Sequence, residues 1–396
     1  MSKRGKIKGG VCAAKGFVAG AVHVGVKAAN KDRVDLAVVA AECAAVAAAT
    51  FTTNRVQAAP VLISKEHVAS KACRAVILNS GNANACTGDD GLADARAMAT
   101  ETAVALGVRP EEVLVCSTGR IGVPMPIKKI RAAIPGLVES LDGSSGRDAA
   151  VAIMTSDSVP KEFALEVTAG RKTFRIGGMA KGAGMIDPNM ATMLSVITTD
   201  AELTKAEAKR MLKLAVGRSF NRITVDGDMS TNDTVILLCS GVAGRVDLGA
   251  VQDSLDAVAL DLATKIVLDG EGVSRFVEVA VAGAASVKDA RKAAEAVANS
   301  QLVKCAWAGA DPNWGRILDA VGYSGAKFDP NRAEIDYDDV SAVRDGMPMK
   351  AAVAKLRRVA RKKAFKVTVR LNAGDASYSV LTTDLTEAYV HFNLGE

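Results

Sequence analysis

The sequence predicts an α/β fold with α+β character, in which mixed β-sheets are flanked by helices. Apolar runs of strand length and amphipathic runs of helical length alternate irregularly along the chain, without strict β-α-β order. Hydrophobic residues make up 49% of the 396 residues but aromatic residues only 4%, so we expect a core of small aliphatic side chains. A chain of this length buries one large core or two moderate ones.

The predicted strands are short runs rich in Val, Ile, Leu and Ala, bounded by polar or glycine-containing turns. They cover residues 17–22, 35–39, 46–51, 75–79, 112–117, 174–176, 193–199, 235–239, 277–282, 333–337 and 366–371. The runs at 193–199 and 235–239 are apolar at consecutive positions, which predicts strands buried on both faces. The segment at 118–122 is predicted to be a turn.

The predicted helices show apolar residues at helical spacing. They cover residues 92–106, 203–220, 251–267, 287–306 and about 351–360. Thr204 followed by Glu207 is a capping-box pattern at the start of the second helix. The last helix carries a basic run, which is typical of a solvated helix face. A boundary near 282–285 predicts a smaller C-terminal domain from about 284 to 396.

Several function classes are disfavoured by the composition. The formal charge of +6 is too diffuse to indicate nucleic-acid binding, and the most apolar segment is too short to cross a membrane. Seven scattered cysteines without CxxC spacing favour reduced thiols in a cytoplasmic protein. The three histidines, His23, His67 and His391, have no metal-site spacing, so no metal is expected.

The segment 181–194 (KGAGMIDPNMATML) is the most informative part of the chain. Its glycines and Asp-Pro turn precede a buried strand, and the hydroxyl of Thr192 lies where the turn meets that strand. A threonine hydroxyl needs a base to become a nucleophile, and histidine is scarce here. Cleavage between Ala191 and Thr192 would make the α-amine of Thr192 available as that base. The alternative is a β-branched residue that simply begins a strand.

Other polar segments follow predicted strands or helices. Thr118 and Gly119 lie in a tight turn whose backbone N–H groups suit an oxyanion hole, although an ordinary glycine turn has the same pattern. Asn79–Asn84 and the run 221–234 are rich in amide, hydroxyl and carboxyl groups, which also suit solvated loops. Glu271 stands between two glycines, where a loop residue is the simpler interpretation.

Taken together, these segments resemble the ornithine acetyltransferase family, the glutamate N-acetyltransferases of arginine biosynthesis. Segment 181–194 resembles the self-cleavage motif of that family. Six further segments resemble family signatures in the expected order: FTTNRVQAAP (51–60), NSGNAN (79–84), STG (117–119), SFNRITVDGDMSTNDT (219–234), DGEG (269–272) and DPNWGRI (311–317). The resemblance spans nearly the whole chain. It favours catalytic or binding roles for these segments over their interpretation as ordinary turns, loops and strand ends.

The resemblance implies a self-cleaving N-terminal-threonine acyltransferase fold. It implies cleavage between Ala191 and Thr192 into an α chain (1–191) and a β chain (192–396), assembled as α2β2. Thr192 would take the acetyl group from N-acetyl-L-ornithine and pass it to L-glutamate in a ping-pong reaction. By the same resemblance, Thr118 and Gly119 form the oxyanion hole. The implied substrate-binding residues are Thr155, Lys181, Thr192, Glu271 and Asn393.

The resemblance implies no cofactor, and it admits acetyl-CoA as a second acetyl donor. No nucleic acid or membrane partner is expected. Family members typically end in an Asn, a Tyr and a terminal Thr or Ser, whereas this sequence continues from Asn393 to Leu394-Gly395-Glu396, so we expect the terminal hydroxyl contact to be absent. The alternative function is that of an N-terminal-threonine amidohydrolase or aminopeptidase of related fold, which passes the acyl group to water. A non-enzymatic relative is disfavoured by the presence of Thr192, Lys181, Thr118 and Glu271.

Overall fold

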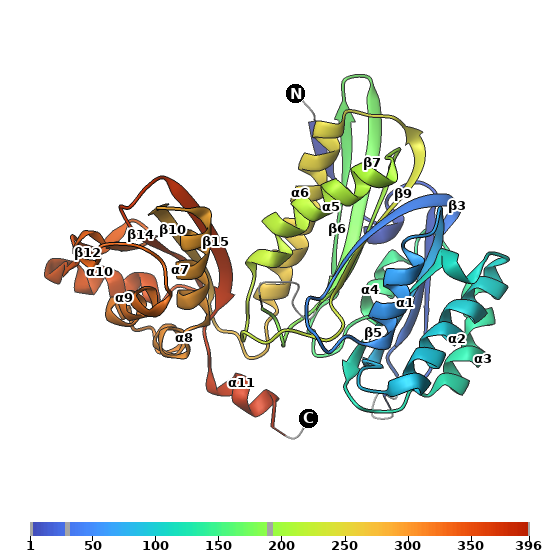
Figure 1. Ribbon diagram of the computed structural model, residues 1–396, viewed down its shortest axis with the longest axis horizontal. Helices are drawn as coiled ribbons and strands as arrows, with labels where there is room; N and C mark the ends of the chain where they lie inside the picture. The colour runs from blue at the N-terminus through green and yellow to red at the C-terminus, as the bar shows by residue number, and fades with distance from the viewer. Residues whose placement is uncertain (1–2, 28–31, 188–192, 395–396) are drawn as a thin grey trace. The chain divides into compact units, whose positions relative to one another are not determined.

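The computed structural model describes residues 3–27, 32–187 and 193–394 (Figure 1). The chain forms two compact units. The first contains Met1–Gly182, Asn189–Asn221 and Asp228–Ile266, and the second contains Ala183–Pro188, Arg222–Gly227 and Val267–Glu396. The longest segment of the second unit begins at Val267 and includes the stretch 284–396, for which a smaller C-terminal domain is expected.

The first unit is built on a nine-stranded mixed sheet. Its strands are β1 (Lys3–Lys6), β2 (Phe17–Val22), β3 (Leu36–Phe51), β4 (Cys73–Asn82), β5 (Val113–Arg120), β6 (Lys161–Ala169), β7 (Lys172–Lys181), β8 (Leu194–Ala201) and β9 (Thr234–Gly244). The order is β1-β6-β7-β8-β9-β3-β4-β5, with β2 also paired to β3. The pairs β4·β5 and β8·β9 are parallel, so the sheet is mixed as predicted.

The central strands are buried on both faces, which explains their nearly continuous apolar runs. In β3, Val38 belongs to one hydrophobic cluster and Val39 to another, and in β4 the same holds for Ile77 and Val76. All eight residues of β8 are buried. The side chains that fill these cores are mostly Ala, Val, Ile and Leu, which confirms the prediction of a core with small aliphatic residues.

Helices cover both faces of this sheet. They are α1 (Ala59–His67), α2 (Gly88–Leu106), α3 (Ile127–Glu139), α4 (Gly146–Ala152), α5 (Lys205–Arg218) and α6 (Leu248–Leu268). Figure 1 shows α1, α2 and α3 beside the strands β4 and β5, and α1 and α2 contact β5. The hydroxyl of Thr204 accepts a hydrogen bond from the Glu207 N–H at the start of α5, which confirms the predicted capping box.

The second unit has a six-stranded mixed sheet of order β13-β12-β11-β14-β10-β15. Its strands are β10 (Phe276–Ala284), β11 (Glu334–Tyr337), β12 (Val340–Arg344), β13 (Met347–Pro348), β14 (Ala364–Arg370) and β15 (Ala376–Thr383). Val277, Val279 and Val281 of β10 are buried and alternate with more accessible residues. This period of two places one face of the strand in the core.

The helices of the second unit are α7 (Val287–Asn299), α8 (Gln301–Ala308), α9 (Trp314–Tyr323), α10 (Val353–Ala360) and α11 (Glu387–Phe392). Short 3-10 turns complete the chain: η1 (Gly10–Cys12), η2 (Pro110–Glu112), η3 (Phe220–Arg222), η4 (Pro330–Arg332) and η5 (Lys350–Ala352). Helix α7 packs on β10 and β15. Trp307, Tyr337 and Phe365 form an aromatic cluster in this core, with Phe365 stacked on Tyr337 and edge-on to Trp307.

Three local predictions were wrong. The strands expected at 35–39 and 46–51 are one strand, β3, because its first part pairs with β2 and β4 and its last part continues into the pairing with β9 without a turn between them. The helix expected at 287–306 is two helices, because Ser300 leaves helical geometry and caps α8 by accepting from Val303 N–H. The turn expected at 118–122 begins later, because β5 runs to Arg120.

The basic run on α10 is a solvated face, as predicted. Arg357 and Arg358 are exposed, whereas Leu356 and Val359 are buried on the opposite face. The cysteines carry free thiols. Within the described ranges, no group of His, Cys, Asp and Glu side chains is arranged to hold a metal ion, and no helix is long and apolar enough to cross a membrane.

Candidate active site

The predicted oxyanion-hole residues lie at the end of β5, where it runs parallel to β4. Thr118 pairs with Ser80, and Gly119 with Gly81. Gly119 has a φ of +135°, and a Cβ added there would lie 2.3 Å from the carbonyl carbon of Gly81 and 2.4 Å from the Asn82 nitrogen. Only glycine allows both this conformation and this approach. The need for glycine at position 119 is therefore steric as well as conformational.

Amide side chains fix this strand end from several directions. The Ser117 hydroxyl donates to Asn79 Oδ1 at 2.6 Å, and Asn79 Nδ2 donates to the Asn82 carbonyl at 2.9 Å. Asn232 Nδ2 donates to the Ala83 carbonyl at 2.6 Å and the Ser117 carbonyl at 2.8 Å. Such satisfied buried networks rigidify the backbone they hold. The run 79–84 and Asn232 thus place the peptide that precedes Thr118.

The polar run at 221–234 is largely buried, so the simpler interpretation as a solvated loop was wrong. Thr224 and Asp233 have no exposed surface, and Asn232 is 4% exposed. Buried polar groups need hydrogen-bond partners, and these side chains bind backbone groups of neighbouring segments. In the first unit, Asp233 Oδ1 accepts from Met193 N–H at 2.9 Å.

Lys181 ends β7, and its side chain reaches Thr118. Its Nζ donates to Thr118 Oγ1 at 3.4 Å, and both residues are almost fully buried. Asp157 is the nearby counter-charge, with its Oδ2 3.9 Å from Lys181 Nζ. The structure thus brings together three predicted site residues, Thr118, Gly119 and Lys181, from strands that lie far apart in the sequence.

Asp157 also holds the fourth predicted site residue of this unit. Its Oδ2 accepts from Thr155 N–H at 3.0 Å, and its Oδ1 accepts from Lys161 Nζ and Gly182 N–H, both at 2.6 Å. Burial by itself would raise the pKa of Asp157, but the Lys181 and Lys161 ammonium groups and the Gly182 N–H outweigh it and lower that pKa to about 2. Asp157 is therefore a carboxylate at neutral pH.

In the second unit, Glu271 and Asn393 lie together. Asn393 Nδ2 donates to Glu271 Oε2 at 3.1 Å, and Glu271 N–H donates to the Ala183 carbonyl at 3.0 Å. The Glu271 carboxylate covers Gly184, where an added Cβ would lie 2.4 Å from Oε2. The glycine at 184 thus leaves room for the carboxylate.

Helix α11 brings Asn393 to Glu271. The Thr386 hydroxyl, which caps α11, donates to the Gly272 carbonyl at 2.6 Å. Gly272 has a φ of +64°, and a Cβ there would lie 2.3 Å from the Tyr389 nitrogen. The Tyr389 hydroxyl donates to Asp226 Oδ2 at 3.2 Å. The glycine after Glu271 therefore permits the close approach of α11.

Asp226 binds the backbone of the first part of the predicted cleavage motif, before the cleavage site itself. Its Oδ2 accepts from Met185 N–H at 2.6 Å and its Oδ1 from Ile186 N–H at 2.8 Å. Thr224 Oγ1 donates to the Ile186 carbonyl at 3.0 Å. The predicted cleavage site, Ala191 and Thr192, lies outside the described residues, and its processing stays a prediction.

Lys304 is a buried titratable residue that the sequence analysis missed. It follows Val303 and precedes Trp307 by three residues, so its position on the buried stripe of α8 was the available signal. Its Nζ donates to Thr382 Oγ1 and Thr383 Oγ1, each at 3.1 Å, and to the Thr383 carbonyl at 2.5 Å. Burial lowers the pKa of Lys304 to about 7, despite the opposing effect of the Asp226 and Asp384 carboxylates.

This burial predicts a stability that rises with pH. Between pH 7 and the ordinary lysine value of 10.5, the unfolded chain binds a proton that the folded chain has released. The free energy of unfolding should therefore rise by up to about 1.4 kcal/mol per pH unit. Urea unfolding from pH 7 to 8.5 measures this as the difference in slope between the wild type and Lys304→Met. The difference is needed because buried thiols such as Cys116, whose pKa burial raises to about 12, begin to ionise in the unfolded chain in this range and contribute the opposite slope in both proteins. Lys304→Met should flatten the rise, and an unchanged slope in that variant would exclude Lys304 as its source.

Asp157 and Lys161 were also missed. In the sequence, neither lies in a recognisable motif. Their mutual ion pair, and the contacts of Asp157 with Lys181 and with backbone N–H groups, depend on how strands and loops pack, and no sequence pattern reports such contacts. Asp226 lies within the polar run 221–234, but its contacts with Met185 N–H and Ile186 N–H were not predicted.

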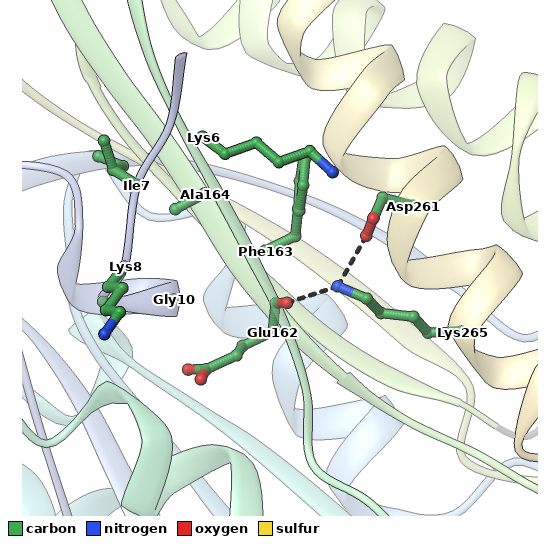
Figure 2. A pocket seen from close by; sticks show the side chains of 10 residues that line it. Lys6, Ile7, Lys8, Gly10, Glu162, Phe163, Ala164, Asp261 and Lys265 are labelled. Atoms are coloured by element: carbon green, nitrogen blue, oxygen red, sulfur yellow. Dashed lines mark hydrogen bonds and ion pairs between the residues drawn. The ribbon is translucent and has the colours of Figure 1, made fainter.

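A charged groove of about 320 Å³ lies elsewhere on the first unit and contains none of the predicted site residues (Figure 2). Lys6 and Lys265 lie over the ring of Phe163, at 5.2 and 5.1 Å from its centroid. Lys265 Nζ also contacts Asp261 Oδ1 and the Glu162 carbonyl, each at 2.7 Å. Figure 2 shows both contacts: the one with Glu162 links α6 to β6, whereas the one with Asp261 lies within α6. The charged side chains Lys265 and Asp261 of this groove are thus accounted for by contacts within the first unit.

Comparisons with known proteins agree with the resemblance. A family model described as the ArgJ family matches residues 18–395. The arginine biosynthesis bifunctional protein ArgJ of Geobacter sulfurreducens is 50% identical over 96% of this chain and 98% of its own length. The protein of the same name from Symbiobacterium thermophilum is 46% identical over 98% of each chain. The structure of ornithine acetyltransferase complexed with ornithine from Mycobacterium tuberculosis matches 48% of this chain and 100% of the solved chain, with 40% identity and a TM-score of 0.43.

Proposed function

The chain belongs to the ArgJ family and is an acetyltransferase of arginine biosynthesis, and we propose that it transfers the acetyl group of N-acetyl-L-ornithine to L-glutamate. The family match over almost the full chain is the observation that carries this proposal. The buried cluster of Thr118, Gly119 and Lys181 supports it, because it combines oxyanion donors with a cation suited to a carboxylate.

We propose that the reaction begins after cleavage of the Ala191–Thr192 peptide bond. The α-amine of Thr192 accepts the hydroxyl proton as Oγ1 attacks the acetyl carbonyl carbon. Thr118 and the Gly119 N–H stabilise the resulting oxyanion. The C–N bond then breaks, the ornithine amine leaves with the proton, and an acetyl ester remains on Thr192. The glutamate amine attacks this ester, which releases N-acetylglutamate and restores the hydroxyl.

The remaining residues bind the substrates in this proposal. Lys181 and Thr155 contact the substrate carboxylate end, and Glu271 with Asn393 contacts an ammonium group. The cleaved chains stay together as α2β2 in the cytoplasm. Neither a metal nor a cofactor takes part, since each step is acyl transfer between a hydroxyl and an amine. Acetyl-CoA is included as a second donor to be tested.

The acceptor decides between this function and the hydrolytic alternative. The purified protein is incubated with N-acetylornithine, with and without glutamate, and the products are followed by mass spectrometry. We expect N-acetylglutamate to form in step with ornithine when glutamate is present. Free acetate as the main product in both mixtures would instead indicate an amidohydrolase. A third mixture with acetyl-CoA and glutamate measures use of that donor.

Asn393 offers a test of the second group of binding residues. Asn393→Ala removes a hydrogen bond to the Glu271 carboxylate, so we expect KM for N-acetylornithine to rise up to about tenfold with little change in kcat. His391→Ala, in the same helix, is the matched control and should behave as the wild type. Equal kinetics for both variants would exclude a binding role for Asn393.

A further inference from the structure

We propose that Asp157 is a positioning residue of the acetyl-transfer site, whose carboxylate sets the place of Lys181 and of the Thr155 backbone beside Thr118. The inference rests on the proposed function. Asp157, together with its ion-pair partner Lys161, holds the Lys181 ammonium group in the position where that group binds the substrate carboxylate. Neither Asp157 nor Lys161 is expected to touch the substrate.

The pairing of β6 with β7 brings two buried lysines together. Lys161 begins β6 and pairs with Ala180 of β7, next to Lys181. Two lysines on adjacent strands are thus brought together, and both are almost fully buried. Like charges in a low-dielectric interior repel strongly, so the pair needs a shared counter-charge. Asp157 supplies it with a side chain that has no exposed surface.

The two lysines lie at unequal distances from the Asp157 carboxylate. Lys161 Nζ lies 2.6 Å from Asp157 Oδ1, whereas Lys181 Nζ lies 3.9 Å from Oδ2. Lys161 is therefore hydrogen-bonded to Asp157. Lys181 is attracted to the Asp157 carboxylate from a longer distance and donates a hydrogen bond to Thr118 Oγ1. The Lys181 ammonium group is thus held beside Thr118 Oγ1, where a cation suits a substrate carboxylate.

Asp157 also binds the backbone of both segments that are proposed to contact the substrate. The Thr155 N–H and the Gly182 N–H both donate to it. Gly182 directly follows Lys181. The Asp157 carboxylate therefore fixes the backbone at the end of β7 and also lies near the Lys181 ammonium group. One side chain therefore fixes residues 155 and 181–182 relative to each other. Small misplacements of substrate-binding groups cost up to about 10²-fold in rate.

The test separates positioning from a purely structural role. Asp157→Asn alone leaves the Lys161 ammonium group buried without its partner, so we pair it with Lys161→Met. The double variant removes the charges of Asp157 and Lys161 while keeping similar side-chain volumes. We expect the double variant to fold and self-cleave, with KM for N-acetylornithine raised about 10- to 100-fold and kcat less affected. Acetylation of Thr192 by 4-nitrophenyl acetate, which has no carboxylate, should stay within about twofold of wild type. Glu166→Gln, which breaks the exposed ion pair to Arg175 between β6 and β7, is the control and should match the wild type.

Two results would overturn the inference alone: wild-type KM in the double variant, or equal losses with both acetyl donors. If the double variant does not fold, Asp157→Glu retains the charge but displaces it. It should then show the same selective rise in KM, and wild-type kinetics or an equal loss with both donors would overturn the inference. Absence of transfer from N-acetylornithine by the wild type would overturn the proposed function together with this inference.

Discussion

Thr192→Ala is expected to give a single uncleaved chain of 40.9 kDa without acetyltransferase activity, whereas the wild type gives two fragments of similar size. The substitution removes the hydroxyl that serves both as the attacking group in cleavage and as the acetyl acceptor. Removal of a nucleophile typically lowers kcat by more than about 10³-fold. Denaturing gels with intact masses measure cleavage, and the second wild-type fragment should begin at Thr192.

Two companion variants make this result specific. Thr192→Ser keeps a hydroxyl and should retain both cleavage and transfer at lower rates. Ser195→Ala removes a nearby buried hydroxyl, which donates to the Met179 carbonyl at 2.9 Å, and should still cleave. Cleavage of Thr192→Ala at the same bond would show that the Thr192 hydroxyl is not the attacking group in cleavage. An active wild type that remains uncut would show that the nucleophile acts without a free α-amine.

Gly119→Ala is the second substitution with a large expected effect. The new methyl group would lie 2.3 Å from the Gly81 carbonyl carbon and 2.4 Å from the Asn82 nitrogen, so the end of β5 must move away from β4. Because the Gly119 N–H is proposed to bind the oxyanion, we expect kcat to fall about 10²- to 10³-fold. KM for N-acetylornithine should change less, since the substrate is held by other side chains.

Gly122→Ala is the matched control for this substitution. Gly122 also has a positive φ, of +75°, but an added Cβ there meets no heavy atom within 4 Å. Gly122→Ala should therefore lower the free energy of unfolding by about 1 kcal/mol through backbone strain. It should cause neither the steric collision nor the fall in kcat. Thermal unfolding of both variants separates stability from catalysis. Equal kcat values for the two alanine variants would argue against an oxyanion role for Gly119.

Much of the fold followed from local patterns. Continuous apolar runs predicted β8 and β9 as strands buried on both faces, and the Thr204–Glu207 pattern located the start of α5. The hairpin of β6 and β7 was largely missed, because its sequence mixes charged and small residues with apolar ones and shows no clear strand pattern. The break at Ser300 was missed because the apolar stripe continues from α7 into α8.

The sequence by itself determined the α/β class, the small aliphatic core and membership in the ArgJ family, because periodicity and ordered motifs are local properties of the chain. Only the tertiary structure decided which residues act together. Parallel pairing of β4 with β5 places Gly119 against Gly81, and the β6–β7 pairing places Lys161 beside Lys181 with Asp157 between their charges. Likewise, the low pKa of Asp157 and the lowered pKa of Lys304 arise from burial and from partners distant in sequence. Such contacts depend on the packing of whole elements, which no single segment specifies.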